Sequence, residues 1–258
     1  MRYLNLLTQK KCNSLEESQF FYYLCTQIDK SDEYLLLKTK NMDKNQKYVI
    51  TINRELGSGG RTIGRKLAEK LNVPFYDKAL INELKKKFNL DTEEIEKLKG
   101  NKNNWWREFI NAAMFMGHGM NEMWYYQRMT GQSAYLLTSN DMFKVEKEIL
   151  TNVAAEESCI IAGRSGFSIF ADHPNHLSIF IQAPLEHRIQ RIMGKQNLTH
   201  EEAEKIIKKV DEMRETYVKK YTGTSRYDTR NYDIVFNMEG KTEDEIVELI
   251  LQYIGWDK

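Results

Sequence analysis

Residues 48–62 read YVITINRELGSGGRT, and the rest of the architecture follows from them. The run begins with β-branched and aromatic residues through Ile52, a composition typical of a buried strand, and then enters a cluster of glycines. After the glycines, Ile63, Leu67 and Leu71 recur at the spacing of one helix face. The segment therefore predicts a strand, a glycine-rich loop and a helix in succession.

The remainder of the chain repeats this alternation. Short apolar runs predict further strands at Pro74–Asp77, Cys159–Ala162, His176–Ile181 and Tyr232–Asn237. Helices are expected from Ala79, from Asp91, over Asp141–Glu157, through Arg188 and Arg191, from Thr199 to about Tyr221, and from Thr242. Capping-box spacing marks the starts at Asp91, Thr199 and Thr242. Strands alternating with helices predict an α/β fold with a parallel sheet and helices on both of its faces.

The domain organisation is predicted from a change in pattern near residue 47. Residues 1–46 form an N-terminal accessory segment or linker, and residues 47–258 form the α/β domain. Met42 could be the real start of translation, because the regular pattern is complete without the residues before it. The stretch Asn101–Gly131 is rich in tryptophan, methionine and glycine, and is expected to line a pocket or an interface or to pack as plain core.

Composition excludes several classes of function. Lys and Arg total 38 and Asp and Glu total 37, so no general attraction to nucleic acid is expected. No apolar stretch approaches the ~20 residues that a membrane span needs. The three cysteines, Cys12, Cys25 and Cys159, are scattered, which argues against a disulfide framework or a zinc site and favours a cytoplasmic protein. Cys159 is expected to be a small buried hydrophobic residue.

The glycine-rich loop suits phosphate binding. A loop that holds an anion turns its backbone N–H groups toward it, which needs backbone angles and close approaches that glycine supplies most easily. The standard pattern is Gly, four residues, then Gly-Lys-Ser/Thr; here Arg61 replaces the lysine and Glu55 stands where the first glycine is expected. The predicted nucleotide-binding residues are Gly57, Ser58, Gly59, Gly60, Arg61 and Thr62. The alternative is a plain turn between a strand and a helix.

Charge at the start of the following helix favours a bound anion. Arg61 and Arg65 fall in its first turns, where the helix dipole disfavours cations by ~0.3–1 kcal/mol, and a bound phosphate would reverse that sign. Arginine also binds phosphate through two N–H groups, so the cation is kept although the geometry changes. The Thr62 hydroxyl would be a ligand of Mg²⁺, the usual role of a hydroxyl at this position.

Several segments together resemble the cytidylate kinase-like family, which uses a variant loop of this type. They are Ile50–Arg61, Pro74–Lys78, Ile161–Arg164, Ala183–Arg188, Tyr217–Gly223 and Arg230–Asp233, and the likeness spans roughly residues 48–254. The resemblance implies a P-loop kinase core with a helical acceptor-binding and lid region. It also implies a phosphotransferase of the nucleoside monophosphate kinase type, which transfers the γ-phosphoryl group of ATP, with Mg²⁺, to a (deoxy)cytidylate-like acceptor.

The resemblance assigns roles to single residues. Arg61, Arg188 and Arg214 would be catalytic cations, because phosphoryl transfer depends on positioning and on charge neutralisation. Asp211 lies on the same helix face as Arg214 and would hold it in place. The alternatives are ordinary: an Asp–Arg pair three residues apart is common on exposed helices, and Arg191 near Arg188 could lie on a solvated face.

The acceptor site follows from the same resemblance. The predicted substrate-binding residues are Asp77, Arg164 and Asp211, with Arg164 contacting the acceptor phosphate. Ser165 replaces the aspartate that follows this arginine in cytidylate kinases. Without that carboxylate, discrimination in favour of cytosine is expected to be weak. Arg164 could instead end the strand and pair with a nearby acid.

Two functions from different classes therefore compete. The first is an ATP-dependent kinase acting on small-molecule nucleotides. The second is a nucleotide-binding sensor or interaction protein without transfer activity. Glu55, Arg61 and Ser165 favour this alternative, because they depart from the standard P-loop and cytidylate kinase patterns. Nucleic-acid binding would need a basic patch that the charge balance does not support. The oligomeric state does not follow from the sequence.

Overall fold

The computed structural model describes Lys40 and residues 42–77, 80–81 and 140–256. The helix predicted from Asp91, the start of the helix predicted at Ala79 and the stretch Asn101–Gly131 lie outside these residues. Among the described residues, no helix is both long and apolar enough to cross a membrane.

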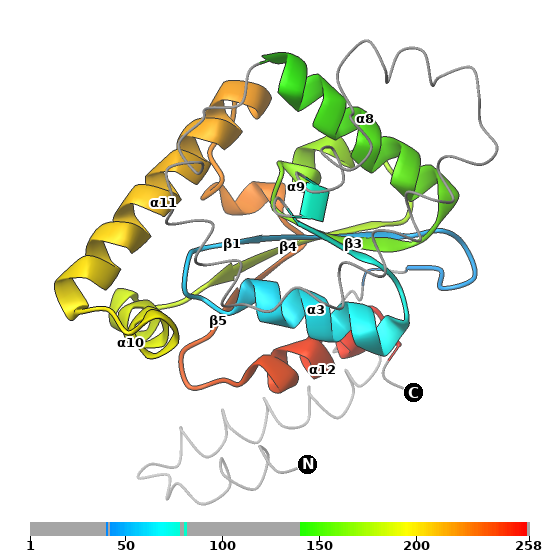
Figure 1. The fold of residues 1–258 in the computed structure, drawn as a ribbon. Helices are drawn as coiled ribbons and strands as arrows, with labels where there is room; N and C mark the ends of the chain where they lie inside the picture. Colours follow the sequence, from blue (N-terminus) through cyan, green and yellow to red (C-terminus); the bar gives the residue numbers. More distant parts are fainter. Residues whose placement is uncertain (1–39, 41, 78–79, 82–139, 257–258) are drawn as a thin grey trace, which may run out of the picture. The chain divides into compact units, whose positions relative to one another are not determined.

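A five-stranded parallel sheet forms the centre of the domain, in the order β2-β3-β1-β4-β5 (Figure 1). Its strands are β1 Val49–Arg54, β2 Phe75–Asp77, β3 Cys159–Ala162, β4 His176–Gln182 and β5 Ile234–Asn237. Strand β1 is buried along its whole length and pairs in register with β3 on one side and β4 on the other. The chain moves from β1 outward to β2 and later crosses to β4 and β5, so the carboxyl end of β1 lies where the direction of winding changes. Ligands of open α/β sheets bind at such a point.

Helices cover both faces of this sheet, as predicted. They are α3 Gly60–Leu71, α8 Asn140–Glu156, α9 Gly166–Ile169, α10 Leu185–Gln196, α11 His200–Thr222 and α12 Glu243–Tyr253. Helices α3 and α12 lie on one face, whereas α8 and α9 lie on the other (Figure 1). The main apolar core joins the sheet to α3 and α12 through residues such as Ile50, Ile63 and Ile250, each with no exposed surface. Helices α10 and α11 share a smaller core that includes Leu56.

Local sequence signals set several helix ends. The capping boxes predicted at Thr199 and Thr242 are both present, with the threonine hydroxyl accepting from the backbone N–H of Glu202 and of Glu245. Helix α11 ends at Gly223, whose φ of 72° is left-handed. Helix α9 was not predicted from the sequence, because four residues are too few to show a helical period.

Some of the described residues just before the predicted boundary at 47 pack on the domain. The Met42 side chain is buried in the main core, and its carbonyl accepts from Nε1 of Trp256 at 3.3 Å. The Asp43 N–H donates to Oδ1 of Asn175 at 3.1 Å. The described residues belong to a compact unit that begins at Lys40. Cys159 is buried, in agreement with the prediction.

Candidate active site

The glycine-rich loop leaves the carboxyl end of β1 and ends at α3. Gly57 and Gly59 both have a φ of 84°, the left-handed region that side chains disfavour. A Cβ atom at Gly57 would lie 2.8 Å from the carbonyl oxygen of Arg188, and one at Gly60 would lie 2.6 Å from Cβ of Arg54. Both contacts are too close, so the loop requires glycine for its backbone angles and for its approach to α10 and β1.

Glu55 fastens this loop to the neighbouring strand. Its carboxylate oxygen Oε2 accepts from the N–H of Ala183, just after β4, at 3.1 Å and lies 3.6 Å from Nε of Arg188. The buried hydroxyl of Ser58 donates to the Glu55 carbonyl at 3.0 Å, which closes the loop on itself. The residue that occupies the place of the first P-loop glycine therefore contributes a carboxylate that anchors the loop.

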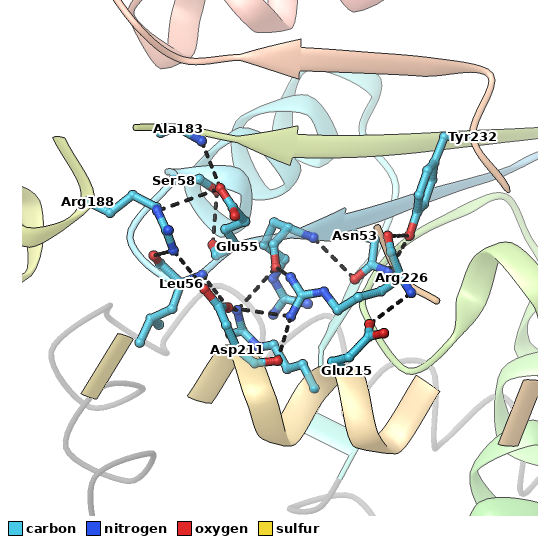
Figure 2. Close-up of polar contacts among 12 residues, drawn as sticks. Asn53, Glu55, Leu56, Ser58, Ala183, Arg188, Asp211, Glu215, Arg226 and Tyr232 are labelled. Carbon is cyan, nitrogen blue, oxygen red and sulfur yellow. Dashed lines mark hydrogen bonds and ion pairs between the residues drawn. The ribbon is translucent and has the colours of Figure 1, made fainter. Parts of the chain in front are cut away.

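Asp211 of α11 lies at the centre of a polar network against the loop (Figure 2). Its Oδ1 accepts from the N–H of Leu56 at 2.9 Å, and its Oδ2 accepts from Nη1 of Arg188 at 2.7 Å. Nη1 of Arg214 lies 3.5 Å from Oδ1 of Asp211 and donates to the carbonyl of Arg54 at 3.2 Å. The structure thus brings together Arg188, Asp211 and Arg214, which were predicted as parts of one site.

Arg226 completes this network and was not predicted. Its side chain has no exposed surface, and its guanidinium donates to the carbonyl of Arg54 and lies 3.4 Å from Oδ1 of Asp211. Burial, together with the neighbouring charge of Arg214, lowers the pKa of Arg226. The residue follows the end of α11 in a loop, where no periodicity marks buried positions. The only signal in the sequence was its position between two segments of the family resemblance.

Arg61 and Asp77 bind each other. Nε of Arg61 lies 2.7 Å from Oδ2 of Asp77, and the two residues are 8% and 1% exposed. Oδ1 of Asp77 accepts from the N–H of Leu80 at 2.9 Å. The cation predicted for the nucleotide phosphates and the carboxylate predicted for the acceptor therefore form one buried ion pair, which joins α3 to the end of β2.

Arg164 follows β3 with a left-handed φ of 57° and is buried. Its guanidinium forms an ion pair with Glu146 of α8, and its Cζ lies 4.7 Å from the ring centre of Tyr217 on α11. The Tyr217 hydroxyl donates to Oε2 of Glu146 at 3.2 Å. Ser165, also left-handed, is 1% exposed, and its hydroxyl has no hydrogen-bond partner among the residues that the structure describes. Glu146 is thus the nearby acid with which Arg164 would pair if its role were only to end the strand.

Thr62 contacts Arg191 of α10, a residue that the sequence placed either in the site beside Arg188 or on a solvated helix face. Its hydroxyl accepts from Nη2 of Arg191 at 3.2 Å, and Nη1 of Arg191 lies 2.5 Å from Oε1 of Glu243 at the start of α12. Although burial alone would raise the pKa of Glu243, the Arg191 guanidinium holds it below its usual value. Arg191 therefore faces the loop, although it could have been expected on a solvated helix face.

The carboxyl edge of the sheet is consequently rich in arginine. Around Asp211, the guanidinium groups of Arg188, Arg214 and Arg226 meet at one carboxylate, and Arg188 also lies 3.6 Å from Oε2 of Glu55. Such a cluster of guanidinium groups suits a polyanionic ligand, because their N–H groups can form charge-assisted hydrogen bonds with phosphate oxygens. Within the described part of the chain, no group of three or more His, Cys, Asp or Glu side chains could hold a metal ion.

Comparisons with known proteins show what the chain is similar to. The family model described as "Cytidylate kinase-like family" matches residues 49–240. The chain is 23% identical to a cytidylate kinase of Sulfolobus acidocaldarius over 212 residues, which is 80% of this chain and 93% of the relative. It is 28% identical to a cytidylate kinase of Saccharolobus islandicus over 111 residues, 43% of this chain and 58% of the relative. The structure of an uncharacterized protein from Eubacterium ventriosum covers 81% of this chain and 99% of its own, with a TM-score of 0.59 and 24% identity, and shares the fold.

Proposed function

Because the chain belongs to the cytidylate kinase-like family, we propose that it is an ATP-dependent phosphotransferase that phosphorylates a nucleoside monophosphate-like acceptor. The observation that carries the proposal is the convergence of Arg188 and Arg214 on the glycine loop, where Asp211 holds both of them. In the reaction, an oxygen of the acceptor phosphate attacks the γ-phosphorus of ATP. The bond to the bridging oxygen breaks, and ADP and a nucleoside diphosphate are formed.

The chain's own residues would bind and neutralise charge. The backbone N–H groups between Gly57 and Thr62 would hold the nucleotide phosphates, and Arg188 and Arg214 would stabilise charge on the transferred group. Arg61 can join them by exchanging the Asp77 carboxylate for a phosphate oxygen, because both ligands offer the same kind of acceptor. Binding of the nucleotide would then exchange protein carboxylates for phosphates at the same guanidinium groups.

The described residues fit Mg²⁺ that is held largely by the nucleotide. Mg²⁺ keeps several waters and takes phosphate oxygens, so it needs few protein ligands. The hydroxyl of Thr62 is an oxygen ligand of the right type at the start of α3. When bound, the ion would neutralise charge on the β- and γ-phosphates. Arg191 would have to leave the Thr62 hydroxyl when the ion binds.

The acceptor would lie near Arg164 and Asp77, with Arg164 on its phosphate. Ser165 offers a neutral hydroxyl where a carboxylate would accept from the amino group of cytosine, so the base would be read weakly.

A second function is a nucleotide sensor without transfer. The observation that favours it is the buried ion pair between Arg61 and Asp77. If Arg61 kept Asp77 as its partner when nucleotide binds, it would not stabilise the transferred group.

Turnover of a panel of acceptors tests the proposal. ADP formation from ATP and Mg²⁺ is measured with CMP, dCMP, UMP and AMP for the wild type, Arg164→Ala and Ser165→Asp. We expect the wild type to accept several bases, and Ser165→Asp to shift preference toward CMP. Loss of a charge-assisted hydrogen bond costs about 1.5–3 kcal/mol, so Arg164→Ala should lower kcat/KM for the acceptor roughly ten- to a hundredfold.

A double variant separates this role from a structural one. Arg164→Ala leaves Glu146 buried without its guanidinium partner, and the further change Glu146→Gln removes that stranded charge. If the double variant regains stability but not turnover, Arg164 acts on the acceptor; recovery of both would assign Arg164 a structural role. Tight ATP binding without turnover of any acceptor would favour the sensor. Strict preference of the wild type for CMP would contradict the interpretation of Ser165.

A further inference from the structure

Arg226 is the largest side chain with no exposed surface among the described residues. It lies between Gly223, where α11 ends, and a short 3₁₀ helix at Thr229–Asn231. Burying a guanidinium is costly unless its N–H groups are paired, and burial of a charge by itself adds little stability. Its contacts therefore indicate what the charge does at this position.

The guanidinium of Arg226 bonds one side of the turn that leads from β1 into the loop and reaches the other side through Asp211. One nitrogen donates to the carbonyl of Arg54, the last residue of β1. The other lies 3.4 Å from the carbonyl oxygen and from Oδ1 of Asp211, and this same Oδ1 accepts from the N–H of Leu56 at 2.9 Å. Arg226 thus holds Arg54 directly and Leu56 through Asp211, immediately before Gly57.

Further bonds fix the backbone of Arg226 (Figure 2). Its N–H donates to Oε2 of Glu215 on α11 at 3.0 Å, and its carbonyl accepts from the hydroxyl of Tyr232 at 2.7 Å. The side-chain amide of Asn53 on β1 donates to the same hydroxyl at 2.7 Å. The backbone of Arg226 is thus tied to α11 through Glu215 and to β1 through Tyr232 and Asn53.

We propose that Arg226 is a positioning residue of the phosphate loop, which fixes the Asp211 carboxylate and the end of β1 so that Arg188, Arg214 and the loop amides face one anion. The role rests on the proposed function and goes beyond it, since Arg226 itself would touch neither nucleotide nor acceptor. It would act through Asp211 and through the carbonyl of Arg54. In this role the guanidinium keeps α11 and the loop in one relative position, since it binds both.

Arg226→Lys is the first variant, because it keeps the charge but replaces the planar guanidinium, whose two terminal nitrogens contact Arg54 and Asp211, with one compact nitrogen. Arg230→Lys is the matched control, since the Arg230 side chain is 88% exposed and pairs with Asp228 of the same loop. We expect kcat of Arg226→Lys to fall about ten- to a hundredfold with little change in the acceptor KM. The control should keep the kcat of the wild type.

A double-mutant cycle on kcat tests whether Arg226 acts through Asp211. It compares Arg226→Lys, Asp211→Asn and both together, at a temperature at which circular dichroism shows all four proteins folded. If the role is correct, Arg226→Lys lowers kcat little further once Asp211 is changed. Losses that multiply would show that the two residues act independently and would overturn the inference.

A measurement without turnover separates this inference from the proposed function. In protein labelled with ¹⁵N-leucine, the Leu56 amide hydrogen should exchange faster in Arg226→Lys than in the wild type. Its exchange rate in Arg230→Lys should equal that of the wild type. If the wild type transfers no phosphoryl group, the proposed function fails while this exchange still tests Arg226. If Arg226→Lys does not fold, Tyr232→Phe replaces it, because it removes the hydroxyl that holds the Arg226 carbonyl. Unchanged Leu56 exchange in the folded variant overturns the inference.

Discussion

Asp211→Asn is the most informative single change in the site. The asparagine keeps an oxygen that can accept from the Leu56 N–H, but removes the negative charge that faces Arg188, Arg214 and Arg226. Asp211 is 7% exposed and Arg226 is fully buried, so solvent screens this charge poorly. Removing one partner of a buried pair costs about 3–5 kcal/mol. Since 1 kcal/mol corresponds to about 2–4 °C in a domain of this size, Tm should fall by about 6–20 °C.

Nucleotide should restore much of this loss. If the phosphates of ATP take the place of the missing carboxylate, ATP with Mg²⁺ should raise Tm of Asp211→Asn by more than it raises Tm of the wild type, at equal saturation. Differential scanning fluorimetry at low ionic strength measures both shifts. Asp228→Asn is the control, because its partner Arg230 is largely exposed and surface pairs contribute little.

Two results would refute this reasoning. A fall in Tm no larger than that of Asp228→Asn would show that the Asp211 contacts contribute little to stability. A nucleotide-induced shift smaller than that of the wild type would show that the guanidinium groups around Asp211 do not face the bound phosphates.

Two further predictions concern His176 and Gly57. Burial lowers the pKa of His176 from 6.5 to about 4, so the unfolded chain binds a proton before the native chain does. The contribution of His176 to the unfolding free energy is therefore complete above pH 6.5 and falls by about 3 kcal/mol as pH drops to 4. Denaturant titrations measure this: the unfolding free energies of the wild type and His176→Asn should converge over that pH range. Gly57→Ala should abolish nucleotide binding in calorimetry and lower Tm more than Gly255→Ala, because both glycines have positive φ but an added Cβ meets Arg188 only at Gly57. Equal effects of the two alanines would refute the close approach of α10 to the loop.

The sequence predicted the order of the elements and the position of the loop. Strands β1, β3 and β4 were found because they are short apolar runs bounded by loop residues, and α3 because its apolar residues repeat at helical spacing. The starts of α11 and α12 were found because a capping box depends on residues three positions apart. These signals are local, so they can be read without knowledge of the rest of the chain.

The sequence also indicated the edge of the sheet at which several candidate residues gather. Parallel strands bring their carboxyl ends to one edge, so residues that follow β1, β3 and β4 had to gather there. Arg188, Asp211 and Arg214 meet at the loop as the resemblance implied. The catalytic and binding roles of these residues remain predictions.

The tertiary structure alone decided which charges from different elements are paired. Arg61 with Asp77, Arg164 with Glu146 and Arg191 with Glu243 are partners far apart along the chain, brought together by the strand order and by helices from different parts of the chain. Arg226 became part of the site because the loop after α11 folds back on β1. Local periodicity carries no record of such contacts, because an ion pair depends on the distance between two side chains in space, and packing of the whole domain sets that distance.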